Sequence, residues 1–245
     1  MSNKKTIIAF DLYGTLLSTS SIAHELALHF GDEKAQSIAA LWRRYQLEYT
    51  FRMNSMSLYK PFLEITHTSL YHALSEHKLS LSEADVGRIM NAYNSLTIFP
   101  DVSSGLENLA KDTEIIAHVF SNGTNEMVSE SVNKSPQLSG FRQLFKELIT
   151  VEEVECYKPH PKVYEHLVRK ARGDVRREDR EGVWLVSGNP FDIVGARAVG
   201  LQTCWVDRMG DGWMDRLGEL ASGGPHVVVK GVDEAVREIQ RMSRS

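Results

Sequence analysis

The chain alternates short apolar runs with longer stretches of helical pattern. Thr6 to Phe10 is continuously apolar, as expected of a strand buried on both faces of a parallel sheet, and Asp11 follows it directly. Similar short runs recur further along, at residues 115–120, 148–151, 183–186, 203–206 and 227–229. This alternation predicts an α/β fold built on a doubly wound, Rossmann-like parallel sheet.

The strand pattern stops between about Ser18 and Thr97. We interpret residues 18–97 as an all-helical insert placed after the first strand, and residues 1–17 and 98–245 as the α/β core. The glycines between residues 209 and 224 indicate a surface loop before the last strand. Within the insert, apolar and aromatic residues recur at helical spacing, at Ile38, Leu41, Trp42, Tyr45 and Tyr49.

Composition narrows the classes of partner and compartment. The 245 residues carry 28 Lys and Arg against 32 Asp and Glu, a net charge of −4, with no long basic tract, which argues against binding to nucleic acid or to an anionic membrane. The first apolar run is too short for a signal peptide or a membrane span. Cys156 and Cys204 are the two cysteines, too few for a disulfide framework, so we expect a reducing, cytoplasmic location.

Polar residues gather where the predicted strands end. Because ligands of parallel sheets bind beyond the carboxyl ends of the strands, we expect these residues to form one site. Asp11 is the candidate nucleophile, since carboxylates form covalent intermediates; the alternative is an N-cap of the following turn. A neighbouring Lys158 would favour the ionised carboxylate. The polar segments at or just after the predicted strand ends are Asp11 to Thr15, Ser121-Asn122-Gly123, Tyr157-Lys158-Pro159 and Ser187 to Asp192.

Taken in order, these motifs resemble the haloacid dehalogenase superfamily, whose first strand ends in a nucleophilic Asp within an Asp-x-x-Gly-Thr pattern. Within that superfamily the chain looks most like the L-2-haloacid dehalogenases. The matching segments are residues 10–16, 41–43, 46–50, 121–123, 157–159 and 203–205. The resemblance implies a core with a helical cap and a hydrolase that converts short (S)-2-haloacids into (R)-2-hydroxyacids.

The resemblance also implies roles for residues of this chain. Asp11 would displace halide from C2 and form an aspartyl ester, and Asp192 with Lys158 would activate the water that hydrolyses it. Arg43 and Asn122 would stabilise the departing halide. The groups that orient the reacting carboxylates would be Thr15, Ser187 and Asn189; those that bind the substrate would be Leu12 and Tyr13 through the backbone, Ser121, Asn122, Tyr164 and Phe191.

Two positions separate this chain from the phosphatases of the same superfamily. Tyr13 stands where they carry a second Asp, the acid that protonates the leaving oxygen, and a halide needs no proton. Asn189 stands where they carry a magnesium ligand. We therefore expect activity on a small anionic 2-haloacid without a metal or other cofactor. His67, His72 and His77 are spaced five residues apart, which does not place them on one helix face for metal binding.

Two other functions stay open at this stage. The first is a magnesium-dependent phosphatase that protonates its leaving group by another route. The second is a catalytically idle binding protein on the same scaffold. Aromatic residues on the insert, where exposed, would also make a homodimer reasonable.

Overall fold

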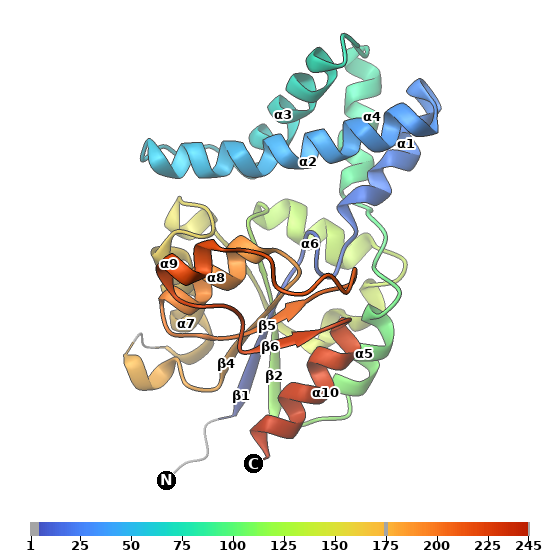
Figure 1. Ribbon diagram of the computed structural model, residues 1–245. Helices are drawn as coiled ribbons and strands as arrows, with labels where there is room; N and C mark the ends of the chain where they lie inside the picture. Colours follow the sequence, from blue (N-terminus) through green and yellow to red (C-terminus); the bar gives the residue numbers. More distant parts are fainter. Residues whose placement is uncertain (1–4, 174–175, 245) are drawn as a thin grey trace.

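The computed structural model describes residues 5–173 and 176–244 of the chain. They form one six-stranded sheet in which every neighbouring pair is parallel, in the order β3-β2-β1-β4-β5-β6 (Figure 1). The predicted α/β fold and parallel sheet are confirmed. The strands are β1 (Thr6–Asp11), β2 (Ile115–Ser121), β3 (Phe145–Thr150), β4 (Val183–Ser187), β5 (Gln202–Val206) and β6 (Val227–Val229).

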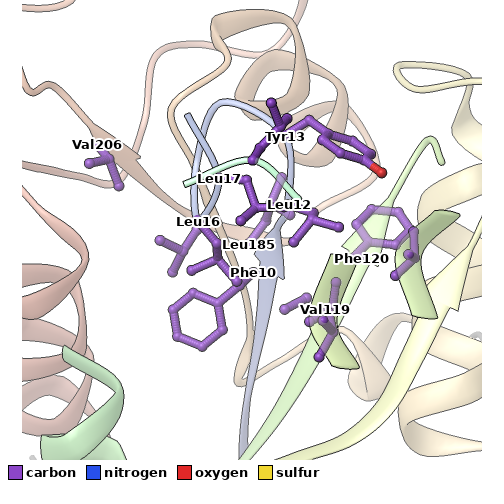
Figure 2. Close-up of a cluster of buried hydrophobic side chains, with 14 of the residues drawn as sticks. Phe10, Leu12, Tyr13, Leu16, Leu17, Val119, Phe120, Leu185 and Val206 are labelled. Carbon is purple, nitrogen blue, oxygen red and sulfur yellow. The ribbon is translucent and has the colours of Figure 1, made fainter. Parts of the chain in front are cut away.

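The first strand is central because its sequence suits no exposed position. Ile7, Ile8, Ala9 and Phe10 are all fully buried, so both faces of β1 are covered. Below its carboxyl end an apolar cluster, which includes Phe10, Leu16 and Leu185, fills the space between the layers (Figure 2). Asp11 therefore ends a strand that is fixed from all sides.

Helices cover both faces of the sheet, as a doubly wound fold requires. In the core, α5 and α10 pack together on one side and α7 and α8 on the other (Figure 1). The core helices are α5 (Val102–Leu109), α6 (Asn125–Lys134), α7 (Pro161–Arg172), α8 (Pro190–Ala198), α9 (Leu217–Ala221) and α10 (Val232–Ser243). None of the described helices is both long and apolar enough to cross a membrane.

Between β1 and α5 the chain is helical throughout its regular elements. The helices are η1 (Thr19–Ile22), α1 (Ala23–Phe30), α2 (Asp32–Ser55), α3 (Phe62–Glu76) and α4 (Glu83–Tyr93), and they lie above the carboxyl edge of the sheet (Figure 1). Trp42 and Tyr45 are buried between α2 and α3, and the indole Nε1 of Trp42 donates to the backbone oxygen of Thr66 at 2.8 Å. The helical pattern of this block is thus observed, with Trp42 and Tyr45 in its interior.

The two crossings between the core and these helices lie side by side. Leu17 and Ile98 form an antiparallel bridge, and the backbone N–H of Ser18 donates to Thr97 at 2.8 Å. Arg208 fixes the base of this junction by donating to the backbone oxygen of Thr15 at 2.8 Å and to Asp101 at 2.7 Å. The polypeptide therefore enters and leaves the helical block at a single place.

The segment of residues 209–224 differs from the expected plain loop, because it contains α9 (Leu217–Ala221). Its first part is held by Asp207, whose carboxylate accepts the backbone N–H groups of Gly210 at 3.0 Å and Gly212 at 2.8 Å. Both glycines have positive φ, which glycine adopts without strain. The glycine content that predicted a loop here did not reveal the short helix.

Candidate active site

Asp11 is held through one of its two carboxylate oxygens. Oδ2 accepts hydrogen bonds from Asn189 Nδ2 at 2.6 Å, Thr15 Oγ1 at 2.7 Å and Ser187 Oγ at 3.3 Å. Oδ1 accepts a bond from Lys158 Nζ at 3.0 Å. The three donors on Oδ2 fix the carboxylate plane, and the lighter contact leaves Oδ1 as the oxygen with room to react.

The donors to Asp11 are themselves positioned by backbone groups of the first and fourth strand ends. Thr15 Oγ1 accepts the N–H of Gly188 at 2.9 Å, and Ser187 Oγ accepts the N–H of Asn189 at 3.1 Å. The two strand ends touch at Gly188, where a Cβ atom would lie 2.7 Å from the oxygen of Gly14. A larger residue at 188 would push these strand ends apart.

Lys158 lies between two carboxylates. Its Nζ is 3.0 Å from Asp11 Oδ1 and 2.8 Å from Asp192 Oδ2, and it also donates to the backbone oxygen of Phe120 at 2.9 Å. The lysine is 1% exposed and Asp192 is fully buried. Three acceptors satisfy the three ammonium hydrogens, which is what a buried charge of this kind needs to be tolerated.

Asp192 has a second partner on α7. The hydroxyl of Tyr164 donates to Asp192 Oδ1 at 2.8 Å. Burial raises the pKa of Asp192, while Lys158 and Tyr164 oppose that rise. Burial and the Asp192 carboxylate hold the pKa of Tyr164 well above its usual value, so the phenol remains a donor at neutral pH. Tyr164 is thus both a buried packing residue and a partner of the site.

The end of β2 contributes Ser121 and Asn122. Asn122 Oδ1 accepts the backbone N–H of Lys158 at 2.9 Å, so the amide Nδ2 is the end of this side chain that can donate elsewhere. Ser121 is fully buried and its Oγ accepts the N–H of Gly123 at 3.0 Å. The Asn122 contact joins the end of β2 to the segment Tyr157-Lys158-Pro159, here called the lysine loop.

Arg43 comes to the same place from α2. Its Nη2 donates to the backbone oxygen of Tyr13 at 3.3 Å and to Asn189 Oδ1 at 3.4 Å, both of them long contacts. Asn189 therefore bonds the nucleophile candidate with one amide atom and approaches Arg43 with the other. The helical block thus places a cation beside two residues of the strand ends.

Aromatic side chains enclose the approach to Asp11. The ring of Tyr13 stacks on Phe62 at 6.0 Å between centroids, and its hydroxyl lies 3.3 Å from Ser131 Oγ on α6. Phe51 of α2 meets Phe191 of α8 edge to face at 5.2 Å. Both pairs join the helical block to the core.

A groove of about 720 Å³ lies elsewhere, between α3, α4 and α6. Its lining includes the carboxylates Glu64, Glu83, Glu126 and Glu130 and none of the strand-end residues. These acids would repel a small anion. Its size alone therefore does not make it a candidate for the reacting site, and the buried cluster at Asp11 remains the candidate.

The residues at the strand ends do not fit a divalent cation. Such an ion would need several oxygen ligands. The ammonium of Lys158 already lies between the carboxylates of Asp11 and Asp192, and Asn189 turns its Nδ2 donor toward Asp11. Among the described residues, no three His, Cys, Asp or Glu side chains gather as a metal site.

Two site neighbours were not identified from the sequence. Gln46 contacts Arg43, and Asn54 contacts the backbone of Tyr157 beside Lys158. A signal was present, because residues three and eleven positions after Arg43 on one helix lie within about 60° of it. Polar residues on the Arg43 face of α2 would have been found by extending that pattern.

The chain is similar to known proteins over most of its length. A family model described as haloacid dehalogenase-like hydrolase matches residues 5–200. The chain is 36% identical over 212 residues to a haloacetate dehalogenase of Moraxella sp. strain B, covering 86% of this chain and 89% of the relative. It is 34% identical over 204 residues to an (S)-2-haloacid dehalogenase of Pseudomonas sp. strain YL, covering 83% of each.

A solved structure shows the same fold over nearly the whole chain. The L-2-haloacid dehalogenase of Xanthobacter autotrophicus, with chloropropionic acid covalently bound, superposes with a TM-score of 0.82 at 27% identity. The match covers 97% of this chain and 99% of that one. The helices between β1 and α5 are thus shared by the matched fold.

Proposed function

The chain belongs to the haloacid dehalogenase-like hydrolases, and from that membership we propose that it releases halide from short (S)-2-haloacids by hydrolysis. The observation that carries the proposal is the buried trio in which Lys158 bridges Asp11 and Asp192. This arrangement supplies a carboxylate nucleophile and a second carboxylate that can accept a proton from water. Tyr13 follows the nucleophile where an acid for an oxygen leaving group would be needed.

In the first step Asp11 Oδ1 attacks C2 of the substrate from the side opposite the halogen. The new bond joins Oδ1 to C2, and the carbon–halogen bond breaks with its electron pair leaving on the halide. The configuration at C2 inverts, and Asp11 becomes an ester. Oδ2 does not take part because three donors hold it.

In the second step water attacks the Asp11 carbonyl carbon and gives a proton to Asp192. The bond between that carbon and Oδ1 then breaks, and the departing alkoxide takes the proton from Asp192 to give the 2-hydroxyacid. Asp11 is left as a carboxylic acid that holds the second hydrogen of the water, and it returns to the carboxylate by losing that proton to solvent. Lys158 and Tyr164 hold Asp192 in position for this exchange. One proton and one halide ion leave for each haloacid hydrolysed.

Substrate binding follows from the remaining donors. In this proposal the Nη2 of Arg43 and the Nδ2 of Asn122 face the departing halide. Arg43 Nη2 is available because its contacts are long. Asn122 Nδ2 is available because the oxygen of that amide, not its nitrogen, holds Lys158. Ser121 and the backbone N–H groups of Leu12 and Tyr13 bind the substrate carboxylate. The Phe51–Phe191 contact limits the length of the substrate chain.

The test is halide release from (S)-2-chloropropionate, with (R)-2-chloropropionate and p-nitrophenyl phosphate plus Mg²⁺ in parallel. We expect release with the (S) compound, none with the phosphate ester and no loss in excess EDTA. Phosphate release that depends on Mg²⁺ would instead establish a phosphatase, and no turnover of any compound would establish an idle scaffold.

The remaining parts of the proposal concern organisation. We take residues 18–97 as a cap domain over a core of 1–17 and 98–245. Cys156 and Cys204 are both free thiols, which supports a reducing compartment such as the cytoplasm. Exposed apolar side chains on the cap, among them Met56 and Leu58, support a homodimer, which light scattering would test.

A further inference from the structure

We propose that Gln46 is the positioning residue of Arg43: it fixes the guanidinium over the nucleophile without neutralising its charge. This inference rests on the proposed function, in which Arg43 meets the departing halide. Gln46 is 1% exposed and lies one turn after Arg43 on α2. Arg43 Nη1 donates to Gln46 Oε1 at 2.6 Å, which is shorter than either contact of Nη2.

The orientation of the Gln46 amide is settled by its neighbours. The hydroxyl of Thr66 donates its single hydrogen to the backbone oxygen of Phe62 at 2.7 Å, so it can only accept from Gln46. Gln46 Nε2 fills that role at 2.9 Å. Oε1 must therefore face Arg43, and it also accepts the hydroxyl of Tyr93 at 3.1 Å.

These bonds divide the guanidinium into a fixed end and a working end. Nη1 is anchored through a buried chain of bonds that reaches α3 by way of Thr66. Nη2 makes long contacts to Tyr13 and Asn189, which a ligand can replace at little cost. The anchor holds the rotamer of a long side chain that would otherwise sample many positions.

The anchor is also uncharged. Within residues 5–173 and 176–244, Arg43 forms no ion pair with a carboxylate, whereas Lys158 forms two. A Glu at position 46 could still accept from Arg43 Nη1, but it would offset the positive charge of the guanidinium and would lose the donor to Thr66. The amide thus keeps the full field of Arg43 available for an anion, and a preorganised charge of this kind acts without reorganisation.

The first test combines two positions. Gln46→Met removes the acceptor at similar volume, and we expect kcat on (S)-2-chloropropionate to fall about tenfold, as for loss of a hydrogen bond to a charged group. In an Arg43→Ala background the same change should cost nothing further. An equal loss in both backgrounds, or wild-type kcat in the single variant, would overturn the proposal.

The leaving group supplies a readout that a purely structural role would not move. Bromide leaves more readily than chloride and needs less stabilisation, so the ratio of kcat for 2-bromopropionate to kcat for 2-chloropropionate should rise in Gln46→Met. Gln46→Glu should raise the same ratio and should weaken inhibition by added bromide, because it keeps an acceptor for Arg43 but offsets the positive charge of the guanidinium. An unchanged ratio in both variants contradicts the proposal.

Gln36→Met is the matched control, because it makes the same replacement at an exposed position of the same helix. We expect its kcat within about twofold of wild type, since Arg43 remains anchored. If Gln46→Met fails to fold, Gln46→Glu and its bromide inhibition decide the question. If wild-type protein releases no halide, the proposed function fails; if it does and the Gln46 variants match it, only this inference fails.

Discussion

The side chain of Asn54, near the end of α2, makes both of its amide hydrogen bonds with the backbone of one core residue, Tyr157. Its Nδ2 donates to the Tyr157 oxygen at 2.7 Å, and its Oδ1 accepts the Tyr157 N–H at 2.9 Å. The next residue is Lys158, whose own N–H is held by Asn122. The lysine loop is therefore clasped by the cap on one side and by the core on the other.

Replacing Asn54 by Ala should loosen the cap over the site. Two neutral hydrogen bonds are worth about 1 kcal/mol each, so we expect kcat/KM for halide release to fall about tenfold or more. The measurement is steady-state halide release together with a thermal melt. Ser55→Ala, at the exposed neighbouring position, is the control. Unchanged kcat/KM in Asn54→Ala would show that the clasp does not matter for turnover.

Asp11→Asn should abolish turnover while keeping the size of the side chain. An amide is not a nucleophile toward C2, so we expect a loss of at least about 10³-fold. During many turnovers in ¹⁸O-labelled water, intact mass should show heavy oxygen in wild-type protein and none in the variant. Wild-type protein that turns over without gaining label would refute the ester intermediate.

Arg43→Ala should lower kcat by about 10²–10³-fold, as expected for removal of one preorganised donor from developing charge. Arg44 is the natural comparison because the next residue on a helix points about 100° away. Its guanidinium lies 5.1 Å from the Tyr45 ring centroid. Arg44→Ala should keep most of the activity, and equal losses in the two variants would remove the special role of Arg43.

Tyr164→Phe should change the pH dependence of turnover. The lost hydroxyl stabilises the ionised form of Asp192, so its removal raises the pKa of that carboxyl further. A step that needs ionised Asp192 then fails at a higher pH, and the acid limb of the kcat profile moves upward. We expect about a fivefold loss on the acid side, measured from pH 4 to 9. Tyr71→Phe, on the cap surface, should leave the profile in place.

His118 should make the fold sensitive to acid. It lies fully buried on β2, neither ring nitrogen has a hydrogen-bond partner among the described residues, and burial lowers its pKa to about 4. Because the unfolded chain binds this proton near pH 6.5, stability rises with pH between these values and is lost as pH falls through them.

The size of that effect can be measured by urea unfolding at pH 7 and pH 5. Wild-type protein should lose about 2 kcal/mol between these pH values through His118. A His118→Leu variant should lose that much less, because its side chain takes up no proton. Parallel losses in the two proteins would assign the acid sensitivity to other groups.

Much of the fold follows from local pattern. The run from Ile7 to Phe10 is apolar without alternation, and only a strand covered on both faces uses such a sequence. Short apolar runs predicted the other strands in the same way. The helical block was predicted because these runs stop and apolar residues recur at helical spacing. The five-residue α9 was not predicted because its segment is rich in glycine. One of these glycines, Gly218, lies within the helix, where a Cβ atom would come within 2.7 Å of the Gly223 oxygen.

For the site, sequence position indicated which residues converge but not how they bond. The strand ends pointed to Asp11, Lys158 and Asp192, since parallel strands end at one edge. That Oδ2 collects three donors, or that Gln46 faces Arg43, depends on side-chain rotamers set by packing across layers. Such contacts join residues that are distant in sequence, as with Asn54 and Tyr157, and no local pattern encodes them.

The paired crossings at Leu17 and Ile98 have a consequence for how this architecture can change. The polypeptide leaves the sheet and returns to it at adjacent points, so the helical block between them is one continuous insertion, here called the cassette. A helical block of another length or sequence could be exchanged there while the six strands keep their order. If Arg43 and Phe51 of the cassette act on the substrate as proposed, selectivity can thereby diversify while Asp11 and Lys158 stay as they are.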